Sequence, residues 1–291
     1  MKILNFGSLN IDNVYAVPHF VAPGETLGAT RVSRNVGGKG LNQSVALARA
    51  GAEVYHAGCV GEDGDFLLAF LAQNGVDISF VKKIDGPSGH AIIQVDENGQ
   101  NSIILYGGAN QCVVAENADR TLENFTAGDI LLLQNEISSL EYLIVNAHRK
   151  GMTVVLNPSP ISPDLLRAPL ELVDWFILNE IEGAALAGTD DPDAVPSALS
   201  AKYPAAKFVM TLGAAGASAF GAGIPYVRVP ATPVKPVDTT AAGDTFTGYF
   251  FASVSQGKTV EEALSLASRA AGIAVTRAGA AASIPSKNEV F

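Results

Sequence analysis

Cysteine is scarce in this chain of 291 residues, and the marks of a secreted or membrane-spanning protein are missing. Only Cys59 and Cys112 occur, far apart and without CxxC or Cys/His spacing. This argues against a structural zinc site and suits a reducing compartment. No apolar run approaches the ~20 residues needed to span a bilayer, and the opening MKILNFGSLN turns polar too early for a signal peptide. We therefore expect a cytoplasmic protein without a membrane partner.

Positive charge is also in short supply. The chain has 19 Lys and Arg against 29 Asp and Glu, a formal net charge of −10, and no basic cluster stands out. This argues against a nucleic-acid partner held through phosphate contacts, and any anionic ligand must be bound locally. What the chain does have is hydrophobic residues, 48% of the total, enough for the core of a large α/β domain.

Short apolar segments alternate with helical patterns along most of the sequence. Residues 41–51 and 138–151 have helical periodicity, and each ends in a glycine suited to a helix C-terminus. Six segments are apolar on both faces, which is typical of strands in a buried parallel sheet: 2–6, 53–60, 129–134, 153–157, 174–179 and 207–211. This alternation predicts an α/β fold, a doubly wound three-layer sandwich with a mainly parallel central sheet. We expect a single domain over residues 1–291, either one large α/β domain or one with a small appendage.

Two segments interrupt the alternation, residues 12–36 and 87–108. Neither has a convincing helical pattern, and the second contains two apolar strands around Asn98-Gly99, a pair typical of a type I′ hairpin turn. We expect these segments to form a small separate β-sheet that acts as a lid over a ligand site. An edge hairpin on the main sheet is the alternative.

The common phosphate-binding patterns GxxxxGK[ST] and GxGxxG do not follow any predicted strand. The nearest candidate is VGGKGLNQ, residues 36–43, in which glycines surround Lys39 directly before a helix. Such glycines allow close backbone approach, and the lysine supplies a mobile positive charge. An ordinary glycine-rich turn explains the stretch equally well.

A second candidate is DTTAAGDTFTG, residues 238–248, at the start of a helix that we expect to end at Gly257. The small residues 241–243 permit a tight turn whose N–H groups converge on an anion. Asp244 then has two interpretations: it caps the helix, or it is a base held beside a bound phosphate.

Polar side chains near strand ends bear on that choice. They are suited to a ligand rich in hydroxyls, such as a sugar, because the carboxyl ends of parallel strands converge on one crevice. Taken singly, each is also explained by a cap or a turn. The set is Asn10, Asp12, Asn42 and Glu136.

Together these stretches resemble a known family. GSLNIDN, GGKGLNQ, LQNE, NPSP, NEIE, TLGAAG and DTTAAGDTF occur in this order, and the chain is similar to the ribokinase family of carbohydrate kinases from its first strand to about Ser286. The resemblance implies ATP-dependent phosphorylation of a pentose, with D-ribose converted to ribose 5-phosphate as the leading case. Another pentose, a deoxysugar or a nucleoside as substrate, or a non-catalytic sugar sensor, stays open as an alternative.

The resemblance also implies a role for each matching residue. Asp244 corresponds to the base, and the backbone of Ala242 and Gly243 to the anion hole. The sugar residues would be Asn10, Asp12, Gly38, Lys39, Asn42, Glu136 and Asp244. The ATP residues would be Asn179, Thr211, Gly213, Ala214, Ala215, Gly216, Gly243 and Ser268.

Two metal ions and a partner follow from the same resemblance. Mg²⁺ would accompany ATP near Asn179 and Glu182, and two subunits would pair through the β lid. A monovalent cation, usually K⁺, would be held by Asp238, Thr240, Ala274, Arg277, Gly279 and Ser283. Ala215 and Ser268 depart from the residues common in the family, so nucleotide binding is the property most open to difference.

Overall fold

A nine-stranded sheet organises the computed structural model, which describes all of residues 1–291. Its strand order is β13-β12-β11-β10-β9-β8-β1-β4-β5. The strands are β1 (Ile3–Phe6), β4 (Val54–Val60), β5 (Asp77–Lys83), β8 (Ile130–Gln134), β9 (Thr153–Asn157), β10 (Trp175–Asn179), β11 (Lys207–Thr211), β12 (Ala217–Gly221) and β13 (Ile224–Val229). The run from β5 to β11 is parallel, and β12 and β13 join it as antiparallel pairs. All six predicted strands are present, and the mainly parallel sheet is confirmed.

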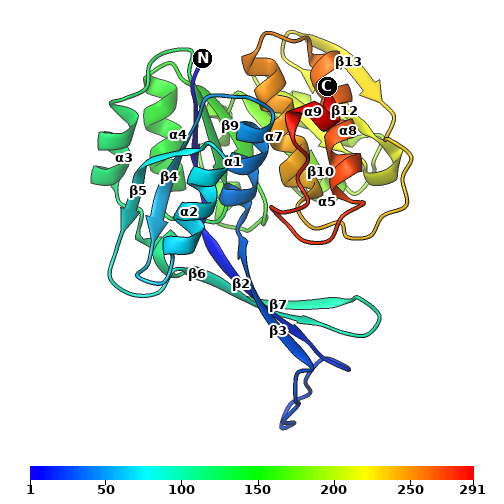
Figure 1. Cartoon of the computed structure of the whole chain (residues 1–291). Helices are drawn as coiled ribbons and strands as arrows, with labels where there is room; N and C mark the ends of the chain where they lie inside the picture. The colour runs from blue at the N-terminus through cyan, green and yellow to red at the C-terminus, as the bar shows by residue number, and fades with distance from the viewer.

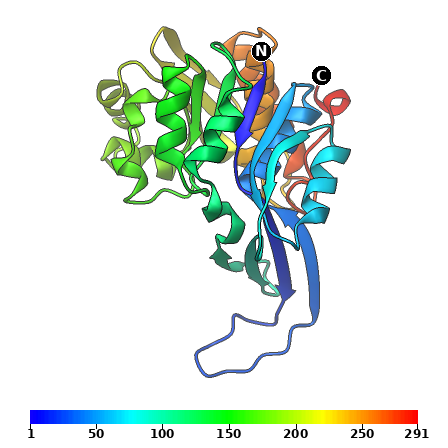
Figure 2. The ribbon, with the colours of Figure 1, turned by 90° about the vertical axis from the view of Figure 1, so that its left-hand side faces the viewer.

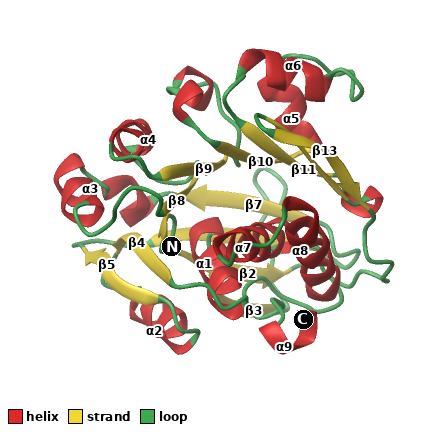
Figure 3. Ribbon diagram, turned by 90° about the horizontal axis from the view of Figure 1, so that it is seen from above, coloured by secondary structure: helices red, strands yellow, loops and turns green.

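Helices cover both faces of this sheet (Figure 3). One face carries α1 (Lys39–Arg49), α2 (Asp65–Gln73), α7 (Ala242–Ser255) and α8 (Val260–Ala274), and the other α3 (Ala115–Leu122), α4 (Leu140–Arg149), α5 (Glu180–Ala187) and α6 (Val195–Lys202). A last short helix, α9, spans Lys287–Val290. Successive strand residues alternate between two cores: Ile130 and Leu132 join the first, and Leu131 and Leu133 the second. The predicted three-layer sandwich is thus confirmed.

The predicted helix ends agree with the glycines that follow them. Helices α1 and α4 are followed within two residues by Gly51 and Gly151, whose φ angles are 88° and 76°. Glycine adopts this left-handed conformation at little cost, so it ends a helix readily.

No helix in the structure combines the length and the apolar character needed to cross a membrane. Both cysteines are free thiols.

A second, four-stranded sheet extends away from the large one (Figures 1 and 2). It contains β2 (Asn10–Ala16), β3 (Arg31–Gly37), β6 (Gly89–Val95) and β7 (Asn101–Tyr106), in the order β3-β2-β6-β7. Because these strands pair only with one another, the edge-hairpin alternative is wrong. The two interrupting segments therefore form a separate small sheet, as expected.

The turn between β6 and β7 differs from the prediction. Only Gly99 has a positive φ angle, 76°, whereas a type I′ turn needs positive φ at both central residues. The Gly99 amide donates to the carbonyl of Asp96, and the Asp96 amide donates to that of Gln100, each at 3.0 Å. The Asp96 carboxylate also accepts the amides of Asn98 and Gln100. This pattern is a type I turn followed by a left-handed glycine, and the aspartate side chain stabilises it.

Candidate active site

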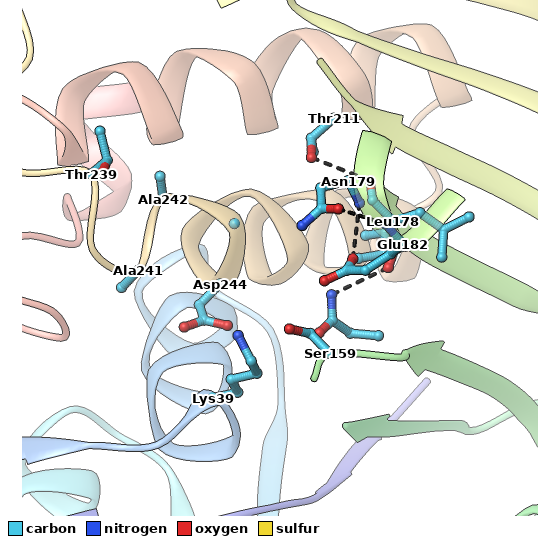
Figure 4. Close-up of a pocket in the computed structure, with 13 residues that line it drawn as sticks. Lys39, Ser159, Leu178, Asn179, Glu182, Thr211, Thr239, Ala241, Ala242 and Asp244 are labelled. Carbon is cyan, nitrogen blue, oxygen red and sulfur yellow. Dashed lines mark hydrogen bonds between the residues drawn. The ribbon is translucent and has the colours of Figure 1, made fainter. Parts of the chain in front are cut away.

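The strand order of the large sheet reverses between β1 and β8. From β1 the chain runs outward to β4 and β5, and from β8 it runs the other way to β9, β10 and β11. Ligands of open α/β sheets bind at the carboxyl ends of the strands near such a point. A cavity of about 240 Å³ opens along this edge (Figure 4). Its lining residues are Lys39, Asn157, Ser159, Ile177, Leu178, Asn179, Glu182, Thr211, Thr239, Ala241, Ala242, Gly243 and Asp244.

The N-terminus of α7 borders this cavity. Ala241, just before the helix, has a φ of 58°, a conformation that few residues other than glycine adopt. The Ala242 amide donates to the carbonyl of Thr239 at 3.2 Å, whereas the amides of Gly243 and Asp244 find no acceptor within the chain. Free amides at the positive end of a helix attract anions. The donors that this turn offers to an anion are therefore chiefly those of Gly243 and Asp244.

The Asp244 carboxylate is held by another helix. It is 8% exposed; Asn42 Nδ2 donates to its Oδ2 at 3.0 Å, and Gln43 Nε2 donates to its Oδ1 at 2.9 Å. Both donors belong to α1, and no amide of α7 bonds to the Asp244 side chain. The capping interpretation is therefore wrong. Asp244 is a buried carboxylate fixed in place at the edge of the cavity.

The GGKG stretch is more than an ordinary turn. Glu136, just after β8, accepts hydrogen bonds from the Lys39 amide at 3.1 Å and from the hydroxyl of Ser8. Ser8 Oγ in turn accepts the Gly40 amide at 3.2 Å. The fit is close, because a Cβ on Gly40 would lie 2.3 Å from the Ser8 nitrogen, and Gly38 has a φ of 92°. This packing seats the start of α1 against the loops that follow β1 and β8.

Lys39 stands among carboxylates. Burial by itself would lower the pKa of Lys39, but Asp244, Glu136 and Glu182 outweigh it and raise that pKa. Burial raises the pKa of Glu136, although Ser8 and Lys39 oppose the shift. The Lys39 side chain points toward Asp244 (Figure 4). A protonated lysine in this position adds positive charge beside the free amides of α7.

Of the residues predicted to hold a sugar, only Lys39 and Asp244 line the cavity; the others, Asn10, Asp12, Gly38, Asn42 and Glu136, lie outside its lining. Asn10 Oδ1 accepts from Asn110 Nδ2 at 2.7 Å. Asp12 is packed against Gly37, and burial, followed by the charge of Glu136, raises its pKa to about 6. Asn42 Oδ1 is buried and has no partner. An acceptor of this kind is costly unless a ligand supplies a donor, as a sugar hydroxyl does.

The N-x-x-E element begins α5. The amide of Glu182 donates to Asn179 Oδ1, and the amide of Asn179 donates to Glu182 Oε2, each at 2.9 Å. This reciprocal capping box stabilises the helix start and aligns both side chains on the cavity (Figure 4). One carboxylate and one amide suit Mg²⁺, which usually keeps several waters and takes few protein ligands. The donor set therefore fits the predicted ion.

The predicted nucleotide residues do not all meet in this cavity. Thr211, at the end of β11, lines it. The short helical turn Gly213–Ala215 and Gly216 follow Thr211 along the same edge without joining the lining. Gly216 has a φ of 98°, and a Cβ there would lie 2.0 Å from the Val229 carbonyl oxygen. Ser268, in α8, donates to the carbonyl of Pro230 at 3.2 Å and also lies outside the cavity.

Asp238 contacts two of the other residues predicted to hold a monovalent cation, Thr240 and Gly279. Its Oδ1 accepts the Thr240 amide and its Oδ2 accepts the Gly279 amide, each at 2.9 Å. The Ala274 carbonyl lies at the end of α8, where it accepts the Arg277 amide at 3.0 Å. A carboxylate and backbone carbonyls are oxygen donors, the type of ligand that a hard cation prefers. The last predicted ligand in this C-terminal segment is Ser283, which is buried.

Sequence patterns did not reveal several polar residues of this region. Ser8 accepts the Gly40 amide of the GGKG turn, and Asn110 donates to Asn10. Asn157 lines the cavity, and its buried Oδ1 has no hydrogen-bond partner. Gln43 bonds Asp244 directly. The only signal for Gln43 and Asn157 was their place inside the motifs GGKGLNQ and NPSP. Their roles depend on contacts with distant parts of the chain.

A buried carboxylate beside free amides at a helix N-terminus, with a lysine close by, is an arrangement suited to phosphoryl transfer to a hydroxyl. On this α/β fold, with its separate small sheet, these features define an ATP-dependent kinase of small molecules. The chain belongs to the pfkB family of carbohydrate kinases, whose model matches residues 1–287.

Named relatives agree with this family. The chain is 37% identical over 297 residues to the ribokinase of Haemophilus influenzae, covering 98% of this chain and 95% of that protein. It is 32% identical over 295 residues to the deoxyribokinase of Salmonella typhi, with coverages of 98% and 96%. The structure of Arabidopsis thaliana ribokinase complexed with ribose and ATP superposes with a TM-score of 0.86 at 30% identity, covering 99% of this chain and 96% of that one.

Proposed function

We propose that the protein transfers the γ-phosphoryl group of ATP to D-ribose and forms ribose 5-phosphate. The observation that carries the proposal is the Asp244 carboxylate, fixed by two amides of α1 next to the free N–H groups at the start of α7. The likeness to ribokinases of known name supports ribose as the sugar.

Each group in the site then has a chemical role. Asp244 accepts the proton of the attacking hydroxyl, which typically contributes about 10²–10⁴-fold to the rate. The amides of Gly243 and Asp244 bind oxygens of the transferring phosphoryl group at the positive end of α7. Lys39 adds positive charge near the same amides. Most of the catalysis comes from positioning and charge stabilisation, as phosphoryl transfer requires.

The sugar is bound through acceptors that the protein leaves free or only partly used. Asn42 Oδ1 has no partner, and Asp12 and Glu136 are carboxylates largely removed from water. Hydroxyl donors of a sugar would pair with these atoms and offset their desolvation. With Asn10 and Gly38 they make up the proposed sugar site.

Two cations complete the proposal. Asn179 and Glu182 would hold hydrated Mg²⁺, which neutralises charge on the ATP phosphates when bound. A K⁺ ion would be held by Asp238 and the nearby carbonyls, and its charge would act on the adjacent turn. The segment from Thr211 to Gly216 and Ser268 would contact the nucleotide.

We further propose that residues 1–291 form one catalytic unit in which the small sheet is the lid and joins two subunits. Large apolar side chains are exposed on that sheet, which is unusual unless they meet a partner: Val32, Ile92, Ile103, Ile104, Leu105 and Tyr106. Because the reaction consumes ATP, we propose the cytoplasm as its location.

The central test combines an Asp244→Ala variant with a panel of sugars assayed by ADP release. We expect Asp244→Ala to lower kcat at least ~10²-fold while sugar binding, measured by calorimetry, largely survives. Near-normal turnover would exclude Asp244 as the base. Repeating the panel with and without K⁺ tests the cation site, and a flat response would remove that assignment.

A deoxypentose is the second candidate substrate, favoured by the similarity to a deoxyribokinase. Comparing kcat/KM for ribose, 2-deoxyribose, other pentoses and nucleosides decides between them, because specificity is a ratio of these values. ADP release that depends on any of these compounds would exclude a non-catalytic sensor.

A further inference from the structure

Gln43 links the Asp244 carboxylate to a polar network inside the core. Its side chain is fully buried in α1, behind the cavity rather than in its lining. Its Nε2 donates to Asp244 Oδ1 at 2.9 Å, while its Oε1 accepts from Gln134 Nε2 at 2.7 Å. Both ends of the amide are thus engaged within the protein. Asn42, its neighbour, keeps one buried atom free.

The network continues beyond Gln134, at the end of β8. Gln134 Nε2 also donates to Asn5 Oδ1 at 2.9 Å. Asn5 Nδ2 donates to the Gly40 carbonyl at 2.7 Å and to Ser44 Oγ at 2.8 Å. Ser44 Oγ lies 2.8 Å from His56 Nδ1. All four of these side chains are fully buried, and burial lowers the pKa of His56 to about 4, so the imidazole is neutral near pH 7.

These contacts fix the direction of each amide in turn. The NH₂ group of Asn5 donates to the Gly40 carbonyl and to Ser44 Oγ, so the Asn5 oxygen faces Gln134. Gln134 must then direct its NH₂ toward Asn5 and Gln43, which leaves its own Oε1 unpaired. As a consequence Gln43 presents its oxygen to Gln134 and its NH₂ to Asp244. A reversed Gln43 would place oxygen against oxygen at the carboxylate.

We propose that Gln43 is a positioning residue for the base, oriented by Gln134 and Asn5. This inference rests on the proposed function of Asp244. A carboxylate with one donor on each oxygen cannot rotate, so the lone pair that accepts the sugar proton keeps its direction. Burying such a chain of amides is costly. The benefit of this chain is that the NH₂ group of Gln43 can point only toward the Asp244 carboxylate.

The test uses Gln43→Met, which keeps the length of the side chain and removes the donor, and Gln134→Met, which removes the orienting group. We expect Gln43→Met to lower kcat about 10-fold to 100-fold, the effect of one hydrogen bond to a charged group. The sugar KM should change less than about threefold, because Gln43 is fully buried and both ends of its amide are bonded within the protein, so it offers no group to a sugar. Gln134→Met should lower kcat less. The control is Gln256→Met: Gln256 is an exposed glutamine at the far end of α7 whose side chain bonds only the Ala50 carbonyl, so its replacement should leave kcat unchanged.

The decisive measurement places Gln43→Met in the Asp244→Ala background. If Gln43 acts through Asp244, the double variant is as slow as Asp244→Ala alone. A further loss in that background, or a kcat within twofold of wild type for Gln43→Met, would overturn the inference. Should Gln43→Met fail to fold, Gln43→Asn, which keeps the amide but shortens its reach, is judged by the same criteria. Near-normal turnover by Asp244→Ala would instead overturn the proposed function itself.

Discussion

Replacement of Asp12 by asparagine should stabilise the free protein and weaken its affinity for the sugar. Burial and the nearby Glu136 raise the pKa of Asp12 from 3.8 to about 6. In this range the folded state binds more protons than the unfolded state, so stability falls as the pH rises from about 4 to 6 and stays lower above it. Asparagine removes the buried charge and with it this loss.

The magnitude follows from the shift in the pKa of Asp12. A rise of about two units corresponds to about 3 kcal/mol, and since the side chain is partly exposed we expect about 2 kcal/mol of added stability at pH 7.5. For a chain of this size that is a rise in Tm of about 3 °C. Near pH 4 the difference from wild type should vanish, because Asp12 is then protonated.

Thermal unfolding at both pH values measures the effect, and Asp129→Asn is the matched control. Asp129 accepts the amides of Lys2 and Thr126 at 2.9 and 3.0 Å. Although burial opposes it, these bonds lower the pKa of Asp129. Stability from this group is present above its unfolded pKa and lost as the pH falls below it, so Asp129→Asn should destabilise at pH 7.5. An Asp12→Asn variant that is no more stable than wild type at pH 7.5 would refute the reasoning.

The sugar KM provides a second measurement on the same variant. In the wild type it should rise as the pH falls through about 6, because Asp12 becomes protonated and loses acceptor capacity. In Asp12→Asn the KM should be raised at every pH and lack this dependence. A KM for Asp12→Asn equal to that of wild type at pH 7.5 would separate Asp12 from the sugar site.

Two further predictions concern the turn and the lid. Ala241→Gly should be neutral or stabilising by up to about 1 kcal/mol in urea unfolding, because glycine tolerates the φ of 58°. Ala241→Val should lower the free energy of unfolding by about 1–2 kcal/mol. Equal stability of the two variants would contradict this. Ile104→Asp should convert the proposed dimer to monomers in light scattering, since Ile104 is 62% exposed on the small sheet. Val114→Asp, at an apolar residue 48% exposed beside α3, is its control, and a wild-type protein that is already monomeric excludes the lid interface.

Local patterns were enough to predict much of the fold. Buried parallel strands are apolar on both faces, so segments such as 129–134 could be predicted as strands from their composition. The glycines after α1 and α4 indicated where these helices end. The edge strand β5 was not predicted, because one side of it faces solvent and the double apolar pattern is lost. The turn at Asn98-Gly99 was mistaken because turn type also depends on loop length and on Asp96.

The sequence by itself determined which chemical groups are available: a carboxylate in the first turn of a helix, glycines around a lysine, and amides near strand ends. Only the tertiary structure showed that the Asp244 side chain makes no hydrogen bond to its own helix, because its donors are Asn42 and Gln43, about 200 residues away along the chain. It also separated two neighbouring amides of α1, one with a free acceptor and one bonded at both ends. A hydrogen bond has direction, and its direction is set by atoms brought together only when the chain folds.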